Sequence, residues 1–194
     1  MTDIRSLCVF CGSRKGADPA YEAAARRLGE VIAAQGIHLV YGAGGIGLMG
    51  VLAETVLANG GRVTGIIPEF LMKYEVGDPG LTELIVVESM HQRKARMFEM
   101  SDGFVVLPGG LGTLDETFEI VTWKQLRQHS KPIVVADVGG YWAGFKDLVA
   151  SIVAGGFAHP KIHELFTVVD DVDKVLPALA AAPEPDEIVL TSHL

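Results

Sequence analysis

Short apolar runs alternate with longer amphipathic stretches along almost the whole chain. The apolar runs are continuous and rich in valine, isoleucine, leucine and phenylalanine, which is typical of strands covered on both faces of a parallel sheet. The pattern predicts strands at residues 6–11, 38–41, 62–67, 84–88, 103–107, 132–137 and 166–169.

Helical patterns fill the intervals between these strands. Asp18 suits an N-cap, Pro19 suits the first helical position, and Gly36 marks the end of that helix. Helices are expected over about 18–35, 47–59, 89–101, 114–128, 142–154 and 172–181. The alternation predicts an α/β fold: a Rossmann-like, doubly wound, mostly parallel sheet with helices on both faces. We expect a single domain over 1–182 and a loose C-terminal tail over 183–194.

A glycine-rich loop follows the fifth predicted strand and leads into a helix. It reads Pro108-Gly109-Gly110-Leu111-Gly112-Thr113-Leu114-Asp115-Glu116. Glycines let backbone approach a ligand closely, and the N–H groups and dipole of a helix N-terminus suit a phosphate. An anion site normally avoids carboxylates, so Asp115 and Glu116 suggest chemistry. Alternatively, Thr113 and Glu116 fit a capping box, and Asp115 fits a first-turn residue that complements the helix dipole.

Two further glycine loops are expected at the same sheet edge, where ligands bind in doubly wound folds. Gly12 and Ser13 follow the first strand, and Gly44 and Gly45 follow the second. Gly42, Gly44 and Gly47 also satisfy G-x-G-x-x-G, with Glu69 as the acidic residue that a dinucleotide site requires. Dinucleotide binding, contact with a mononucleotide, and tight strand-to-helix packing without a ligand all remain open for this loop.

An arginine interrupts the apolar face of the 89–101 segment. At about 100° per residue, Met90, Met97 and Met100 share one face, and Arg93 lies within it. A buried arginine needs a partner, because an unpaired buried charge is costly. A structural ion pair would serve, as would a ligand phosphate. The start of this helix and the 108–113 loop lie at the same sheet edge, which favours the ligand, and Lys94 could reach the same anion.

Charge and composition exclude several partners. The net charge is −8 and no basic tract occurs, so we do not expect nucleic acid binding. No run of 18 apolar residues occurs, so no membrane span is expected, and the 49% hydrophobic content could instead serve a subunit interface. The first residues carry no signal-peptide pattern, which predicts a cytoplasmic protein.

Two other residue pairs have spacings found in known sites. Cys8 and Cys11 have redox-motif spacing, but they lie in a predicted strand, so we expect buried, inert thiols on opposite faces. His159 and His163 lack an evident third ligand, so no metal site is expected.

Two motifs resemble the Lonely Guy family: Met90-His91-Gln92-Arg93-Lys94 and the loop from Pro108 to Glu116. The resemblance also covers 9–13, 42–50 and 155–157, and thus nearly the whole chain. These proteins are cytokinin riboside 5′-monophosphate phosphoribohydrolases, and similar sequences are often labelled lysine decarboxylases. No residue context here suggests the pyridoxal site that a decarboxylase would use.

The resemblance implies an enzyme that cleaves the N-glycosidic bond between adenine, or an N6-modified adenine, and ribose 5-phosphate. It implies no cofactor and a homodimer with active sites near the subunit interface. Arg93 and Glu116 match the catalytic pair. The positions that match substrate-binding residues are Glu75, Lys94, Gly109, Gly110, Leu111, Gly112, Thr113, Asp115 and Thr122. Asp115 stands where the family usually has Glu. A non-catalytic carrier of nucleotide or molybdenum cofactor remains the alternative.

Overall fold

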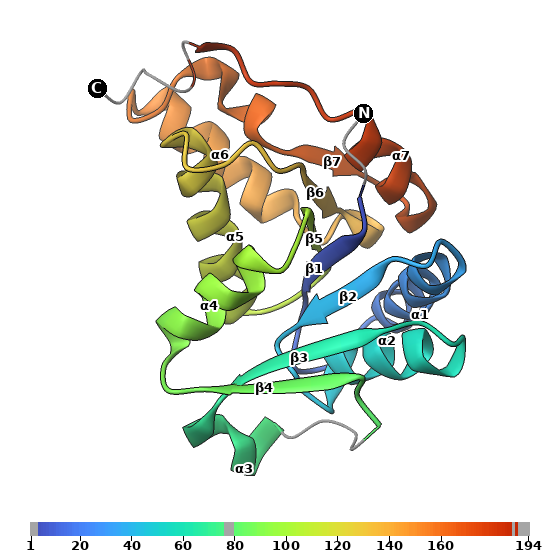
Figure 1. Ribbon diagram of the computed structural model, residues 1–194. Coiled ribbons are helices and arrows are strands. Elements are labelled where there is room, and N and C mark those ends of the chain that lie inside the picture. Colours follow the sequence, from blue (N-terminus) through green and yellow to red (C-terminus); the bar gives the residue numbers. More distant parts are fainter. Residues whose placement is uncertain (1–3, 76–79, 188, 190–194) are drawn as a thin grey trace.

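The described residues build one seven-stranded, entirely parallel sheet (Figure 1). The computed structural model describes residues 4–75, 80–187 and 189. The strands are β1 (Ser6–Phe10), β2 (His38–Tyr41), β3 (Val63–Pro68), β4 (Glu83–Val87), β5 (Gly103–Val106), β6 (Ile133–Ala136) and β7 (Thr167–Val169). The predicted α/β fold class is confirmed, and no predicted strand end differs from these by more than one residue.

The order in which the chain adds strands to the sheet reverses at its centre, between β1 and β5. Its strand order is β4-β3-β2-β1-β5-β6-β7, so the chain builds outward from β1 on one side and then returns to pair β5 with the other edge of β1. In doubly wound sheets, ligands bind outside the carboxyl ends of the strands at such a reversal. The loops that follow β1 and β5 are therefore the ones that the topology selects.

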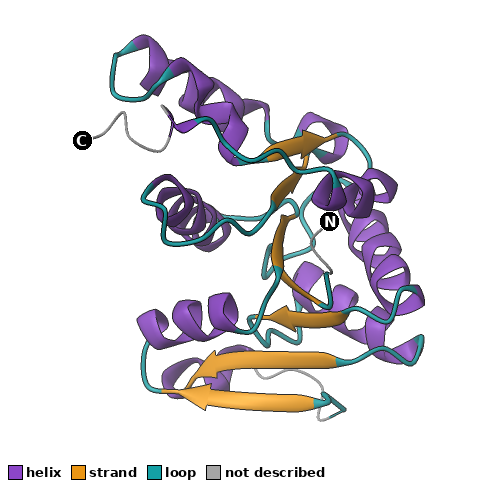
Figure 2. Cartoon of the chain, turned by 45° about the horizontal axis from the view of Figure 1, so that its top comes forward, coloured by secondary structure: helices purple, strands orange, loops and turns teal. Residues whose placement is uncertain are grey.

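Helices cover both faces of the sheet (Figures 1 and 2). One face carries α1 (Pro19–Ala34), α2 (Gly47–Ala58) and α7 (Val175–Ala180), and the other carries α4 (Met90–Glu99), α5 (Leu111–Gln125) and α6 (Ala143–Ala154). The remaining elements are short: α3 (Met72–Glu75), η1 (Glu69–Leu71), η2 (Val138–Gly140), η3 (Pro160–Leu165) and η4 (Val172–Lys174).

Alternation along β1 sends its side chains into two separate cores. Cys8 is buried in the core beneath α4, α5 and α6, whereas Cys11, just past the strand end, is buried in the core beneath α1 and α2. Burial raises the pKa of both thiols, and the charge of Glu116 raises both further. Both cysteines are free. The predicted burial on opposite faces is confirmed.

Three elements differ from the sequence prediction. Helix α5 begins at Leu111 rather than 114 and ends at Gln125 rather than 128. Strand β4 is an edge strand with most of its residues exposed, including Leu84 and Val86, rather than a strand covered on both faces. The 172–181 helix is divided into η4 and α7.

The segment predicted as a loose tail contacts the domain where the structure describes it. Asp186 accepts a hydrogen bond from Lys161 at 2.7 Å, and its backbone N–H donates to Glu164. Val189 is fully buried in the core beneath α5 and α6. These residues are therefore held against the rest of the fold.

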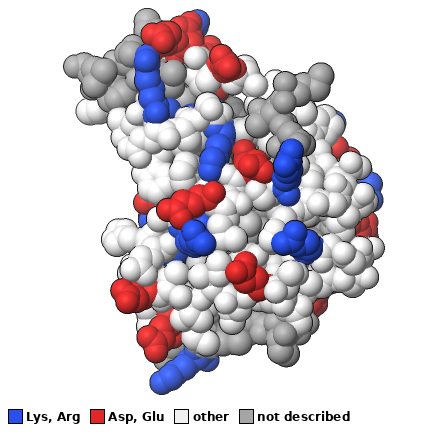
Figure 3. Space-filling model, in the orientation of Figure 1, with Lys and Arg blue, Asp and Glu red and all other residues white. Residues whose placement is uncertain are grey.

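Positive and negative side chains are interspersed on the face that Figure 3 shows, with no basic surface. Within 4–75, 80–187 and 189, no helix has the length and apolarity to cross a membrane. The same residues contain no cluster of three or more His, Cys, Asp or Glu side chains arranged to hold a metal ion.

Candidate active site

The N-terminus of helix α5 lies at the carboxyl end of β5, where the strand order of the sheet reverses. Gly110 occupies the N-cap position with no side-chain cap, and the first intrahelical bond runs from Leu114 N–H to Gly110 O at 3.1 Å. The N–H groups of Leu111, Gly112 and Thr113 therefore have no acceptor within the helix. These N–H groups and the positive end of the helix dipole form an anion site.

The predicted capping box is wrong. Because α5 starts at Leu111, Thr113 lies at the third helical position and Glu116 lies in the second turn. Thr113 is buried, and its carbonyl accepts a hydrogen bond from Thr117 Oγ1 at 2.6 Å. Asp115 also lies beyond the first turn, so it is not placed to complement the dipole. Glu116 is consequently not needed as a cap.

The loops after β1 and β5 are joined directly. Gly12 N–H donates to Pro108 O at 3.0 Å. A Cβ at Gly109 would collide with the side chain of Thr113 and would lie 2.9 Å from Gly12 N. Gly109 is therefore required for the two loops to pack together at the mouth of α5.

Arg93 is held in a fixed position from α4. Its side chain is buried, at 5% exposed. Its Nε donates to Ile66 O at 3.1 Å, its Nη2 donates to Gly42 O, and its Nη1 lies against Met90 Sδ. The ends of β2 and β3 thus bind the guanidinium through backbone carbonyls. The sequence predicts that an anion holds Arg93, but it does not reveal these two acceptors.

Arg93 and Glu116 line the same cavity. Its volume is about 190 Å³, and its walls are Cys11, Ser13, Met49, Met90, Arg93, Gly110, Leu111, Gly112, Thr113 and Glu116. Glu116 is half-buried. The cavity therefore brings together a buried cation, a carboxylate and the open end of α5, with two methionines as apolar walls.

Lys94 and Asp115 pair with each other at the side of this cavity. Lys94 Nζ lies 3.0 Å from Asp115 Oδ2 and 3.2 Å from Glu119 Oε1. Burial on its own lowers the pKa of Lys94, but the hydrogen bonds to the two carboxylates outweigh it and raise that pKa. Neither Lys94 nor Asp115 is among the described residues that line the cavity.

Protein atoms fill the space beside the three glycines of the G-x-G-x-x-G pattern. A Cβ at Gly42 would collide with Arg93, one at Gly44 with Met49, and one at Gly47 with the backbone of Ser13 and Arg14. Gly47 also has a φ of +66°. Of the three alternatives for this loop, these contacts favour tight strand-to-helix packing without a ligand. Gly44 and Gly45 are not among the described cavity-lining residues, and Glu69 is exposed in η1.

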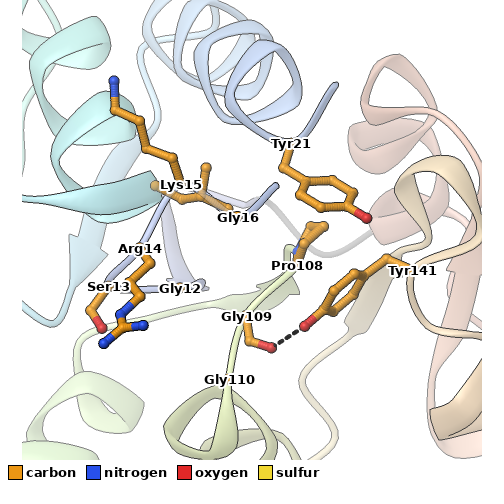
Figure 4. Close-up of a pocket in the computed structure, with 11 residues that line it drawn as sticks. Gly12, Ser13, Arg14, Lys15, Gly16, Tyr21, Pro108, Gly109, Gly110 and Tyr141 are labelled. Atoms are coloured by element: carbon orange, nitrogen blue, oxygen red, sulfur yellow. Dashed lines mark hydrogen bonds between the residues drawn. The ribbon is translucent and has the colours of Figure 1, made fainter. Parts of the chain in front are cut away.

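A second hollow of about 300 Å³ adjoins the first through Ser13 and Gly110 (Figure 4). Tyr21 and Tyr141 stand together on one side of it, with ring centroids 5.2 Å apart, and Arg14 lies opposite. Tyr141 donates from its hydroxyl to Gly109 O at 2.6 Å and so fixes the glycine loop. Tyr141 follows Gly139 and Gly140 past the carboxyl end of β6. Because ligands bind at the carboxyl ends of the strands in such sheets, the sequence could have indicated Tyr141 as a site residue.

Two further predicted site residues are not among the described residues that line the cavity. Thr122 is exposed on α5, nearly two turns beyond Glu116, and does not line the cavity of this chain. The side chain of Glu75 is outside the described residues, although its backbone ends α3. Met49 lines the cavity although no sequence signal marks it, and Cys11 lines it although the sequence predicts only an inert, buried thiol.

The sheet is Rossmann-like, and its strand order reverses between β1 and β5. At that point lie the open N-terminus of α5, an arginine and a glutamate. These features are typical of the class of proteins that bind a phosphorylated small molecule. Comparison with known proteins agrees. Residues 49–179 match the family described as "Possible lysine decarboxylase". The cytokinin riboside 5′-monophosphate phosphoribohydrolase LOG3 of Arabidopsis thaliana is 44% identical over 84% of this chain and 75% of its own length. LOG7 of the same plant is 39% identical over 95% of this chain and 86% of its own length. The chain belongs to this family of phosphoribohydrolases.

Solved structures show the same fold. The molybdenum cofactor carrier protein from Chlamydomonas reinhardtii has a TM-score of 0.69 at 21% identity, over 91% of this chain and 96% of that one. The molybdenum cofactor binding protein from Rippkaea orientalis has a TM-score of 0.68 at 20% identity, over 93% and 98%. At this identity the likeness establishes the architecture alone.

Proposed function

We propose that this protein hydrolyses the N-glycosidic bond of adenine-type nucleoside 5′-monophosphates, releasing the free base and ribose 5-phosphate. The observation that carries the proposal is that Arg93 and Glu116, on different helices, line one cavity with the open N-terminus of α5. Family membership supplies the substrate class: a cytokinin riboside 5′-monophosphate, AMP, or both.

The substrate phosphate binds at the free N–H groups of Leu111, Gly112 and Thr113. Three N–H donors and the helix dipole hold a phosphate without a lysine, and the glycine loop leaves room for its oxygens. This placement directs the ribose toward Glu116, one turn further along α5. Met49 and Met90 then provide the apolar surface against which a planar base can pack.

Glu116 acts on the reacting sugar. Breaking the bond between the base and C1′ builds oxocarbenium character on the ribose, as in glycoside hydrolysis. A carboxylate beside that carbon stabilises the positive charge and accepts a proton from the attacking water. Water supplies the new C1′ hydroxyl, the electron pair of the broken bond leaves with the base, and the base takes up a proton from solvent while Glu116 releases the proton that it accepted.

Arg93 orients the substrate. Two of its partners are backbone carbonyls, of Gly42 just past β2 and of Ile66 in β3, so the guanidinium is positioned before substrate arrives. Preorganised charge of this kind costs no rearrangement during the reaction. Every group in the scheme belongs to the protein, the substrate or water, so no cofactor is required. The homodimer, the cytoplasmic location and the substrate contacts of Lys94, Asp115, Thr122 and Glu75 are further predictions from the sequence and the family resemblance.

The test is release of adenine from AMP and of isopentenyladenine from isopentenyl-AMP, followed by chromatography. Arg93→Ala and Glu116→Gln should each lower kcat/KM by at least a hundredfold, since electrostatic and general-base contributions are each worth about 10²–10⁴. Arg96→Ala and Glu99→Gln are matched controls, because both residues are exposed on α4 and pair with each other at 3.1 Å. Unchanged turnover in both site variants would refute the assignment. Nucleotide that stays bound and intact for hours would instead indicate a carrier.

A further inference from the structure

Lys124 is a buried cation with no role in the proposed reaction. It lies near the C-terminal end of α5, and only 2% of its surface is exposed. Its ammonium group makes no hydrogen bond or ion pair with any residue in the described part of the chain. Burial lowers its pKa to about 8, and no carboxylate opposes that effect.

Lys94 and Lys131, which are half-buried, and Lys146, which is exposed, each have a partner in the described part of the chain. Lys94 binds Asp115 and Glu119, and Lys146 binds Asp137 at 2.7 Å. Lys131 donates to Phe98 O at 2.6 Å. Lys124 is more deeply buried than any of these, yet it lacks such a partner. The stem of Lys124 is enclosed, but its nitrogen is not fully buried and reaches the adjoining cavity, so a counter-charge is expected there.

A cavity of about 320 Å³ lies beside Lys124, lined also by Arg127, His129, Ser130 and Pro185. Arg127 binds Glu187 through Nη2, which leaves further N–H groups of the guanidinium available. The hydroxyl of Ser130 has no hydrogen bond within the described residues. The cavity therefore presents donors and positive charge, and the carboxylate that pairs with Arg127, that of Glu187, is mostly exposed.

The imidazole of His129 lines the cavity in its neutral form and adds no positive charge to it. Its Nε2 lies 2.8 Å from Ile120 O, and its Nδ1 accepts from Lys131 N–H at 3.1 Å. These contacts require one proton, on Nε2. Burial, together with the charges of Lys124 and Lys131, lowers the pKa of His129, despite the hydrogen bond to Ile120. The ring thus leaves Lys124, Arg127 and Ser130 as the donors that face the cavity.

We propose that this cavity binds a small molecule through an oxyanion, a phosphate or a carboxylate, with the ammonium of Lys124 as its principal anchor and with Ser130 and Arg127 as additional donors. An oxyanion accepts strong hydrogen bonds from ammonium and guanidinium groups and supplies the missing counter-charge. The site is separate from the candidate active site, because eight residues of helix, or about 12 Å, lie between Glu116 and Lys124.

The direct test observes Lys124 itself. In protein carrying ¹³C-labelled lysine, the Cε resonance that is missing from Lys124→Met identifies this residue, and its pH titration is recorded without and with inorganic phosphate or malonate. A bound oxyanion stabilises the protonated amine, so the titration midpoint should rise by at least one pH unit. The resonances of Lys174, an exposed lysine paired with Asp170, should not move. The titration itself is recorded on the wild-type protein, and the variant serves only to assign the resonance.

Calorimetric titration provides the second measurement. Phosphate can also bind at the N-terminus of α5, so the expected result is two sites in the wild type, one of which weakens at least tenfold in Lys124→Met but not in Lys174→Met. A response to phosphate alone identifies a phosphorylated ligand, and a response to malonate alone identifies a carboxylate. An unmoved Lys124 midpoint with both anions, at concentrations up to 50-fold above those that occupy the α5 N-terminus, would overturn the proposal.

Discussion

Replacing Gly42 with alanine should displace the arginine of the proposed active site while leaving the chemical identity of Arg93 and Glu116 unchanged. The added Cβ would lie 2.9 Å from Arg93 Cζ. Carbon atoms in contact sit about 3.5–4.0 Å apart, so the guanidinium must withdraw by about 1 Å. The backbone of Gly42 does not have a positive φ, so the substitution acts through this collision rather than through backbone strain.

Both activity and stability should respond. A misplacement of about 1 Å in a positioning group costs about a hundredfold in rate, so kcat should fall by that order. The same movement weakens the hydrogen bonds from Arg93 to Gly42 O and Ile66 O. Bonds from charged groups contribute about 1.5–3 kcal/mol each, so a weakening equivalent to one such bond should lower Tm by about 3–12 °C for a chain of this size.

The measurements are adenine release at saturating AMP and differential scanning calorimetry. Gly144→Ala is the matched control, because a Cβ there meets nothing within 4 Å and the residue lies inside α6. That control should keep wild-type kcat and gain up to about 1 kcal/mol of stability from the better helix former. If Gly42→Ala retains kcat within twofold and an unchanged Tm, then Arg93 is not held as described.

The remaining predictions concern titration and thiol chemistry. Lys124→Met should stabilise the protein by up to about 3 kcal/mol at pH 7 in phosphate-free buffer, because a folded pKa of about 8, below the unfolded value, means that the buried charge destabilises the fold. In urea denaturation, this gain should be full below pH 8 and vanish as the pH approaches 10.5. A gain that is constant with pH would contradict the depressed pKa. Lys94→Met should cost at most about 1 kcal/mol, because Asp115 is mostly exposed. Because the pKa of Lys94 is raised, that cost should be present below pH 10.5 and disappear at higher pH. Cys8 and Cys11 should react with a disulfide reagent only after unfolding, as burial raises both pKa values; rapid labelling of native protein would show otherwise.

The apolar pattern predicted the sheet well because parallel strands buried on both faces need continuous apolar runs, and β4 departs from its prediction because it is an edge. The predicted start of α5, at residue 114, is wrong because tertiary packing outweighs local helix preference there. Gly110 and Gly112 are poor helix formers, and Thr113 suits a cap, so local preference places the helix start later. The packing of Thr113 against Gly109 instead secures a first turn that begins at Leu111.

The site residues also fall into those that the sequence pattern can indicate and those that depend on tertiary packing. Arg93 could be selected from the sequence because a charge interrupts an apolar stripe. Its acceptors on Gly42 and Ile66 could not, since backbone carbonyls carry no sequence signal and these residues lie 51 and 27 positions away. Lys124 had no signal either, because its burial depends on tertiary packing, and Pro185, which lines the same cavity, lies far along the chain.

The pairing of β1 with β5 also determines when the site can form. Strands β1 to β4 are joined to sequence neighbours, whereas β5 reaches β1 across almost a hundred residues, as the contacts between Ser6 and Asp102 show. Closing so long a loop is entropically costly, so such pairings tend to form late. Gly12 and Pro108 meet only once this closure has occurred. A chain emerging from the ribosome can therefore assemble β1 to β4 while still lacking any phosphate site, and nucleotide can stabilise only those molecules in which the two halves of the sheet have joined.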